Sequence, residues 1–191
     1  MTQPQNAGLS SVQEPEPLPG LTWGLKRSFI KYISALPDGG HAVSGGASLA
    51  HSSFFNFQPS GGSTYSPLTG GGILKFAGEV CLTGHHNLLF VMIADPWIEF
   101  ADGGAVLSVA DTRHWPDRGR RIPLARLRAE TLSRSERGVY GEARTFLTGE
   151  GRGVFNDQYG DGEELDPVFI LGHGLATETD AGESIAMPGG P

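Results

Sequence analysis

Short apolar segments, each bounded by residues typical of turns, recur through the middle of the chain and restrict it to a fold of short strands. The chain contains 29 Gly and 13 Pro, which supply many turns and disfavour long helices. With no helical pattern between the segments, antiparallel pairing in a sandwich or barrel-like domain is expected. The strand candidates are ILKFAGEVCL (73–82), LLFVMIA (88–94), AVLSVAD (105–111), IPLARLRAE (122–130) and VYGEARTFL (139–147).

Helices are expected only near the two ends of this mainly β domain. The segment LTWGLKRSFIKYISAL (21–36) has apolar residues at helical spacing, which predicts a short N-terminal helix with Tyr32 on its apolar face. Thr22 is the expected N-cap, and the Pro and Gly residues of 37–40 end the helix. A short late helix is expected within residues 150–160. The stripe of the first helix comprises Leu25, Phe29, Tyr32 and Leu36.

Composition along the chain predicts one domain between two tails. Residues 1–20 and 176–191 are poor in aromatic residues and rich in polar residues, Pro or Gly, a composition that cannot bury enough surface to order itself. Residues 21–175 are therefore expected to form a single domain, which suits a chain of 191 residues.

The charge of the chain excludes some classes of partner. With 14 basic and 21 acidic residues, the net charge of −7 opposes binding to nucleic acid. No apolar run is long enough for a transmembrane segment, and the N-terminus lacks the features of a signal peptide. A cytoplasmic location is the expectation from these features alone.

Three segments together identify a family resemblance, whereas the common nucleotide, zinc, hydrolase and calcium motifs are missing from the sequence. In order, the segments resemble the HtaA domain, a haem-uptake module of Gram-positive actinobacteria. The resemblance covers nearly all of residues 21–171. The segments are WGLKRSFIKYI (23–33), FAGEVCLTGHHNLLFVMIADPWIEF (76–100) and FNDQYGDGEELDPVFIL (155–171).

The resemblance implies a β-rich domain that binds haem b, with a short helix that presents a tyrosine to the iron. By motif position, the ligand is Tyr32, the supporting histidine is His85, and Tyr159 is a second supporting tyrosine. It also implies other haem-transfer proteins as partners and an extracellular or cell-surface location. The sequence does not predict an oligomeric state.

The chemistry of these residue types agrees with what the resemblance implies. A phenolate is a hard anionic donor that prefers Fe(III), so tyrosine ligation holds haem in the ferric state. A histidine bonded to the phenol oxygen would orient the ligand. Motif position favours His85, yet His86 is its neighbour, and adjacent residues on a strand point to opposite faces.

Further residues near the ligand are candidates for haem contacts. Ser28 lies one helical turn before Tyr32, so its hydroxyl is expected on the pocket side, and the helix also carries three cations that could face the propionates or simply solvent. His51 is a candidate distal residue. The cations are Lys26, Arg27 and Lys31.

Two other classes of function stay open at this point. Tyrosine also ligates haem in catalases, so a peroxidase-like or catalase-like haem enzyme is the first alternative. A β domain that binds a different ligand or a protein is the second. A haem carrier or holder, and not an enzyme, is the expectation.

Overall fold

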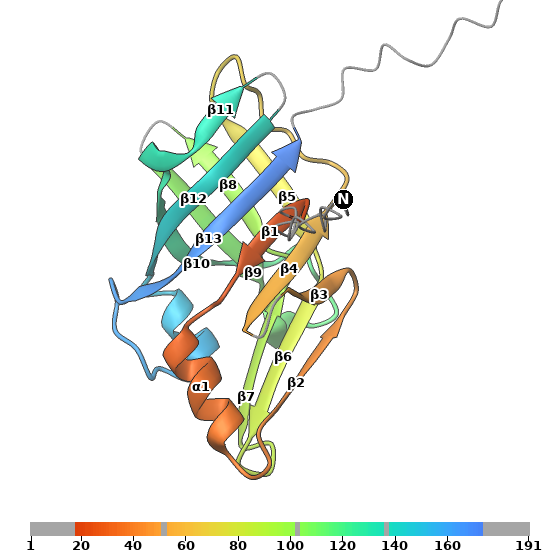
Figure 1. The fold of residues 1–191 in the computed structure, drawn as a ribbon, viewed down its shortest axis with the longest axis vertical. Coiled ribbons are helices and arrows are strands. Elements are labelled where there is room, and N and C mark those ends of the chain that lie inside the picture. The colour runs from red at the N-terminus through yellow and green to blue at the C-terminus, as the bar shows by residue number, and fades with distance from the viewer. Residues whose placement is uncertain (1–17, 51–52, 102–103, 136–137, 174–191) are drawn as a thin grey trace, which may run out of the picture.

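Eight antiparallel strands close into a barrel, which forms the upper part of the molecule in Figure 1. The computed structural model describes residues 18–50, 53–101, 104–135 and 138–173. The barrel closes because β1 pairs with β13 on one side and with β4 on the other. In order around it lie β1 (Gly20–Trp23), β13 (Glu164–His173), β12 (Gly138–Leu147), β10 (Arg121–Arg128), β9 (Gly104–Ala110), β8 (Trp97–Ala101), β5 (Gly72–Ala77) and β4 (Phe54–Pro59). β3 (Ala47–Ala50) adds to β4, and β11 (Ser133–Ser135) adds to β12.

Alternating side chains fill the barrel. In β8, Ile98 and Phe100 are buried while Glu99 between them is exposed, as the two-residue period of a strand requires. Large aromatic residues supply much of the interior, where each removes a large apolar area from water. They include Trp23, Phe55, Phe57, Tyr65 and Phe76, all at most 2% exposed.

A three-stranded sheet extends below the barrel, and the single α-helix of the described residues lies along it (Figure 1). The sheet consists of β2 (Gly40–Ser44), β6 (Glu79–Gly84) and β7 (Leu89–Ala94). α1 (Arg27–Ala35) buries Phe29 and Ile33. The predicted strand 73–82 is two strands, because Gly78 has a φ of +141° and separates β5 of the barrel from β6 of the small sheet.

The predicted helix over residues 21–36 begins later than expected. Residues 20–23 form β1, because Leu21 and Trp23 find buried positions between β13 and β4, where strand pairing outweighs helical spacing. The helix starts after Lys26, which has no side-chain capping bond, so Thr22 is not its N-cap. The predicted end before residues 37–40 is confirmed, since α1 ends at Ala35.

The other boundaries agree in part with the sequence. The late helix is a 3₁₀ turn, η3 (Gly151–Phe155), and two further turns are η1 (Thr112–His114) and η2 (Ala129–Thr131). Seven strands within the described residues lie outside the five predicted segments: β1, β2, β3, β4, β8, β11 and β13. The mainly β, antiparallel fold class is confirmed. No helix in the described part of the chain is long and apolar enough to span a bilayer.

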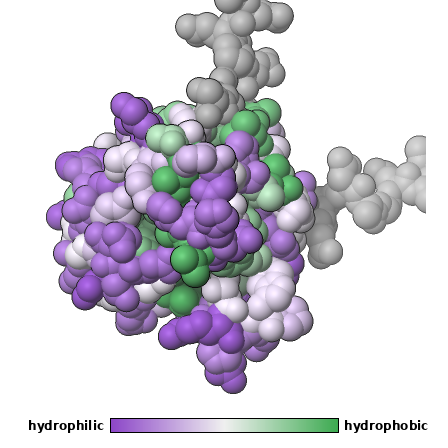
Figure 2. All heavy atoms as spheres, turned by 90° about the horizontal axis from the view of Figure 1, so that it is seen from below, coloured by the Kyte–Doolittle hydropathy of each residue, from purple (hydrophilic) through white to green (hydrophobic). Residues whose placement is uncertain are grey.

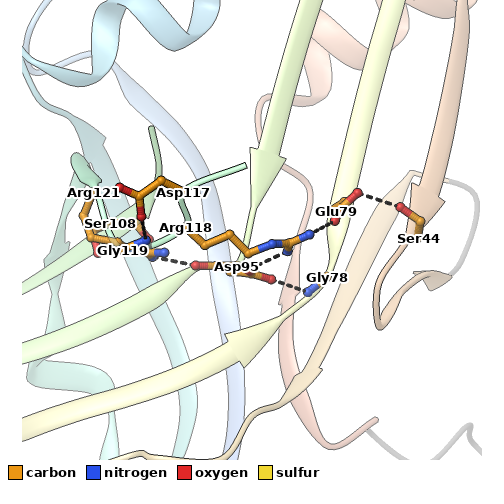
Figure 3. A network of polar contacts seen from close by, with 9 residues as sticks. All are labelled: Ser44, Gly78, Glu79, Asp95, Ser108, Asp117, Arg118, Gly119 and Arg121. Atoms are coloured by element: carbon orange, nitrogen blue, oxygen red, sulfur yellow. Dashed lines mark hydrogen bonds and ion pairs between the residues drawn. The ribbon is translucent and has the colours of Figure 1, made fainter. Parts of the chain in front are cut away.

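A polar network joins the barrel to the small sheet. Figure 3 shows Arg118, from the loop between β9 and β10, reaching between Asp95 and Glu79, which lie just after β7 and at the start of β6. Arg118 donates to Asp95 Oδ2 at 2.7 Å and also to Glu79 Oε1. Arg121 donates to the Asp95 carbonyl at 2.5 Å, and burial lowers the pKa of its guanidinium to about 10, which leaves it charged at neutral pH. Arg118 and Arg121 thus act inside the fold.

Candidate ligand-binding site

A cavity of about 660 Å³ opens beside α1, within the range of small-molecule sites. Three segments surround it: the helix, the turn between β6 and β7, and the loop after η3. Figure 2, the view from below, shows apolar side chains gathered near the middle of this face among hydrophilic ones. The cavity is lined by Phe29, Tyr32, His85, Leu88, Leu89, Asn156, Gln158 and Tyr159.

Tyr32 and His85 meet at this cavity although they lie 53 residues apart in the chain. The phenol oxygen lies 2.5 Å from Nε2 of His85, a short hydrogen bond. A neutral phenol donates this bond to the imidazole, whereas a phenolate accepts it from a protonated Nε2. Tyr32 is 47% exposed, so it lies at the edge of the helix facing the cavity and not on the buried face with Phe29 and Ile33.

The turn that carries His85 places the two neighbouring histidines differently, but not by the alternation of a strand. His85, His86 and Asn87 all have left-handed φ values, of 51°, 56° and 66°. The N–H of Leu88 donates to the carbonyl of His85 at 3.1 Å and closes the turn. The side chain of His86 is 96% exposed and is not among the residues that line the cavity.

Asp38 connects this turn to the end of α1. Its Oδ2 accepts a hydrogen bond from the backbone N–H of His86, and this bond is the main reason that the pKa of the Asp38 carboxyl lies below its ordinary value. The His86 ring lies close, with Nδ1 4.0 Å from Oδ2. Asp38 is therefore an ionised acceptor at neutral pH.

Tyr159 forms part of the opposite wall of the cavity. Its ring packs edge-on against Phe29 and Phe155, with centroid distances of 6.4 and 5.8 Å, and Lys26 Nζ lies 5.4 Å from its centroid. The structure thus brings Tyr159 to the same cavity as Tyr32 and His85, in the position of an aromatic wall.

The basic residues at the start of α1 pair with residues just before β13 and at its start. Lys26 Nζ lies 2.6 Å from Glu163 Oε1 and donates to the Glu164 carbonyl, while Arg27 Nε lies 2.8 Å from Asp166 Oδ2. These two cations hold β13 beside the helix. Lys31 has no ion pair within the described residues and is exposed. Ser28 is also exposed and is not among the residues lining the cavity, contrary to the expectation for its hydroxyl.

Several other aromatic residues, a histidine and the cysteine are not among the residues that line the cavity. Phe55 and Phe57 belong to the barrel core, and Phe54 packs on Phe169 at 6.3 Å. His41 is exposed on β2 with its ring 5.9 Å from that of Phe55. Cys81 is partly buried on β6, where desolvation raises the pKa of its thiol. His51 lies outside the described residues.

The sequence did not identify four of the lining residues. Leu88 and Leu89 were assigned to a strand, and Asn156 and Gln158 to a late helix. Their proximity to the T-G-H and F-x-x-x-Y motifs was the only available signal. Nothing in the local sequence indicates that the two loops line the same cavity, because they are far apart in the chain and meet only beside α1.

The fold and the cavity define a small antiparallel β-barrel domain with an open pocket between a helix and two loops. The family model for HtaA matches residues 20–170, and the chain belongs to this family. No curated protein sequence matches the chain.

Solved structures of the same fold come from Corynebacterium glutamicum. The C-terminal domain of HtaA is 25% identical with a TM-score of 0.67, and the N-terminal domain is 27% identical with a TM-score of 0.64; each match covers 78% of this chain and 92% of the other. The haem-binding protein HtaB is 21% identical with a TM-score of 0.60, covering 78% of this chain and 89% of the other, and supports the fold alone.

Proposed function

We propose that this protein binds haem b in the ferric state through the phenolate of Tyr32 and acts as a haem carrier or holder. The observation that carries the proposal is the hydrogen bond between Tyr32 and His85 at the mouth of an apolar cavity, in a chain of the HtaA family. This arrangement is the one that the family resemblance implies.

The residues present fit such a group. Phe29, Leu88, Leu89 and Tyr159 offer apolar and aromatic surface to a flat porphyrin, and one oxygen donor faces the same space. A tyrosine phenolate is a hard anionic ligand that stabilises Fe(III) against reduction, which suits holding haem more than redox turnover.

His85 would serve as the partner of the ligand oxygen. Its Nε2 can take the proton that the phenol must lose, and Nε2–H can then donate to the phenolate and hold its orientation. His86 is proposed to make no such contact, since its side chain is almost fully exposed. For Ser28 the exposed position favours at most a contact at the edge of the bound group.

The lack of a second histidine among the described residues that line the cavity favours a carrier over a haem enzyme. Among the described residues that line the cavity, His85 is the only histidine, and it is bonded to Tyr32. Peroxide activation needs a positioned distal acid or base that is free to act. Transfer to and from other haem proteins fits a partly exposed site of this kind.

Hemin titration with difference spectra tests the proposal. Wild type is expected to bind one hemin with the absorption of a ferric tyrosinate complex, and Tyr32→Phe is expected to lose that spectrum and most of the affinity. Tyr140→Phe is the matched control, because Tyr140 is 45% exposed on β12 and is not among the lining residues. Unchanged hemin affinity in Tyr32→Phe would contradict the assignment.

The two histidines give a second comparison in the same assay. His85→Ala is expected to weaken hemin binding about 10- to 100-fold, the usual effect of removing a group that supports a metal ligand. His86→Ala is expected to change it less than about twofold. A larger loss of hemin affinity in His86→Ala than in His85→Ala would show that His86 has the supporting role.

A further inference from the structure

We infer that Asp38 is a positioning residue of this site, holding the turn of His85 against the end of α1 and thereby setting the hydrogen bond between His85 and Tyr32. The inference rests on the proposed function for its importance to haem, but the positioning itself can be measured without haem.

The turn needs a stabilising contact from outside, because its backbone conformation is unfavourable by itself. Three consecutive residues other than Gly adopt left-handed φ values, and side chains with a Cβ disfavour that region. Within the turn, the bond from Leu88 N–H to the His85 carbonyl closes the chain but does not tie it to the helix. A bond from outside is what relates the turn to Tyr32.

Asp38 is well placed to supply that bond because its own position is fixed to the helix. Leu36 N–H donates to the Ile33 carbonyl and Gly39 N–H to the Leu36 carbonyl, both at 3.1 Å. Gly39 packs so closely that an added Cβ would lie 1.8 Å from the Ile33 carbonyl oxygen. The backbone on both sides of Asp38 is therefore set by α1, and its carboxylate reaches the N–H of His86 from this base.

Three contacts connect α1 and the residues just after it to Gly84 and the turn that follows. Tyr32 meets His85, Leu36 packs on Gly84, and Asp38 meets His86. At Gly84 an added Cβ would lie 2.6 Å from Cδ1 of Leu36, so this middle contact is close but apolar and sets no direction. The Asp38 bond is directional and acts on the residue next to His85.

A small movement of the turn would be enough to weaken the hydrogen bond between Tyr32 and His85. The Tyr32–His85 bond is 2.5 Å long, and hydrogen bonds weaken steeply with distance and misalignment. Without the Asp38 carboxylate, the N–H of His86 would turn to water, and the His85 ring would sample positions away from the phenol oxygen. The expected result is a weaker site in a protein that is otherwise folded.

The first test uses the protein without haem. In ¹⁵N spectra of the imidazoles, Asp38→Ala is expected to shift the Nε2 signal of His85 toward that of a free ring, as Tyr32→Phe does. Asp117→Ala is the control, since Asp117 is 57% exposed and pairs with Arg120. An unchanged His85 signal in folded Asp38→Ala would overturn the inference, whatever the hemin result.

The second test asks whether Asp38 acts through His85. Hemin dissociation is measured for Asp38→Ala, for His85→Ala and for the double variant. Asp38→Ala alone is expected to weaken binding about 10-fold, whereas in the His85→Ala background it should have an effect below about twofold. An equal loss in both backgrounds would overturn the inference, because it would show that Asp38 acts on the fold and not on His85.

A conservative variant distinguishes the loss of this hydrogen bond from a general failure to fold. The amide oxygen of Asp38→Asn can still accept from His86 N–H, so this variant is expected to recover most of the affinity and the His85 signal. An Asn variant as weak as Asp38→Ala would contradict the role of the hydrogen bond. If wild type itself fails to bind hemin, the proposed function fails, while the imidazole spectra still decide the positioning role.

Discussion

Tyr32 shows how the position of one residue on a helix controls what it can do. Its neighbours Phe29 and Ile33 are 4% and 3% exposed and belong to the core, whereas Tyr32 is 47% exposed and turns its hydroxyl to His85. One step around the helix separates a packing residue from one that is free to bind a ligand. A tyrosine ligand needs this edge position, because a fully buried phenol could not reach an open cavity.

Gly78 lies between β5 of the barrel and β6 of the small sheet. Its φ is +141°, and an added Cβ would lie 2.5 Å from the backbone nitrogen of Ala47. Gly78→Ala is expected to lower the free energy of unfolding by about 2–3 kcal/mol in urea denaturation. Gly61→Ala is the control, because Gly61 has open space around its Cα, and it should change that free energy by less than about 0.5 kcal/mol. Equal stability of the two variants would contradict this explanation of the break between strands β5 and β6.

At the scale of elements, the loop between β9 and β10 fastens the small sheet to the barrel. Arg118 pairs with Glu79 and Asp95, whose side chains are 18% and 14% exposed. Arg121, the first residue of β10, donates to the carbonyls of Asp95 and Ser108. The turn that carries His85 thus lies at the far end of a sheet held at its base by this network (Figures 1 and 3).

Arg118→Ala is expected to destabilise the protein, because it leaves two partly buried carboxylates without their cation. Since Arg118 itself is 42% exposed, solvent screens the pair, and we expect a loss of about 1–2 kcal/mol in the free energy of unfolding, between the values for exposed and buried pairs. Thermal and urea denaturation measure it. Arg120→Ala provides the comparison, since Arg120 is 64% exposed and its single ion pair among the described residues is with Asp117. An equally large loss in this variant would exclude a special role for Arg118.

At the scale of the whole molecule, ionised carboxylates determine the response to acid. The pKa values of Asp111, Asp38, Asp161 and Glu164 lie below the ordinary values of 3.8 for Asp and 4.5 for Glu; donors from Arg113, His86, Arg126 and Arg144 are the main causes. A lowered folded-state pKa adds stability that is complete above the ordinary pKa and is lost as pH falls through the folded value. The protein should therefore lose stability as pH falls below about 4.5.

Asp111 is expected to dominate this acid response, because its side chain is only 7% exposed, whereas that of Asp161 is 58% exposed and screened. Free energies of unfolding are measured in urea between about pH 7 and about pH 3. Asp111→Asn should flatten the fall below about pH 4.5 more than Asp161→Asn does. A wild-type stability that is constant over this range would contradict the prediction.

Much of this protein follows from local sequence. The short strands, the turn glycines and the end of α1 depend on neighbouring residues. The three family segments contain Tyr32, His85 and Tyr159 at motif positions that the sequence alone identifies. These features are predictable because side-chain period and backbone preference act over a few residues.

The rest depended on contacts between distant segments. Residues 20–23 have helical spacing but become a strand because β4 and β13 accept them on both sides. His85 lines the cavity while His86 is exposed, and the two residues lie in a left-handed turn whose His86 N–H donates to Asp38, 48 residues away; strand alternation does not apply to them. Local sequence therefore indicated part of the site, Tyr32, His85 and Tyr159. Tertiary packing decided which residues meet there, because hydrogen bonds depend on positions that only the closed fold brings together.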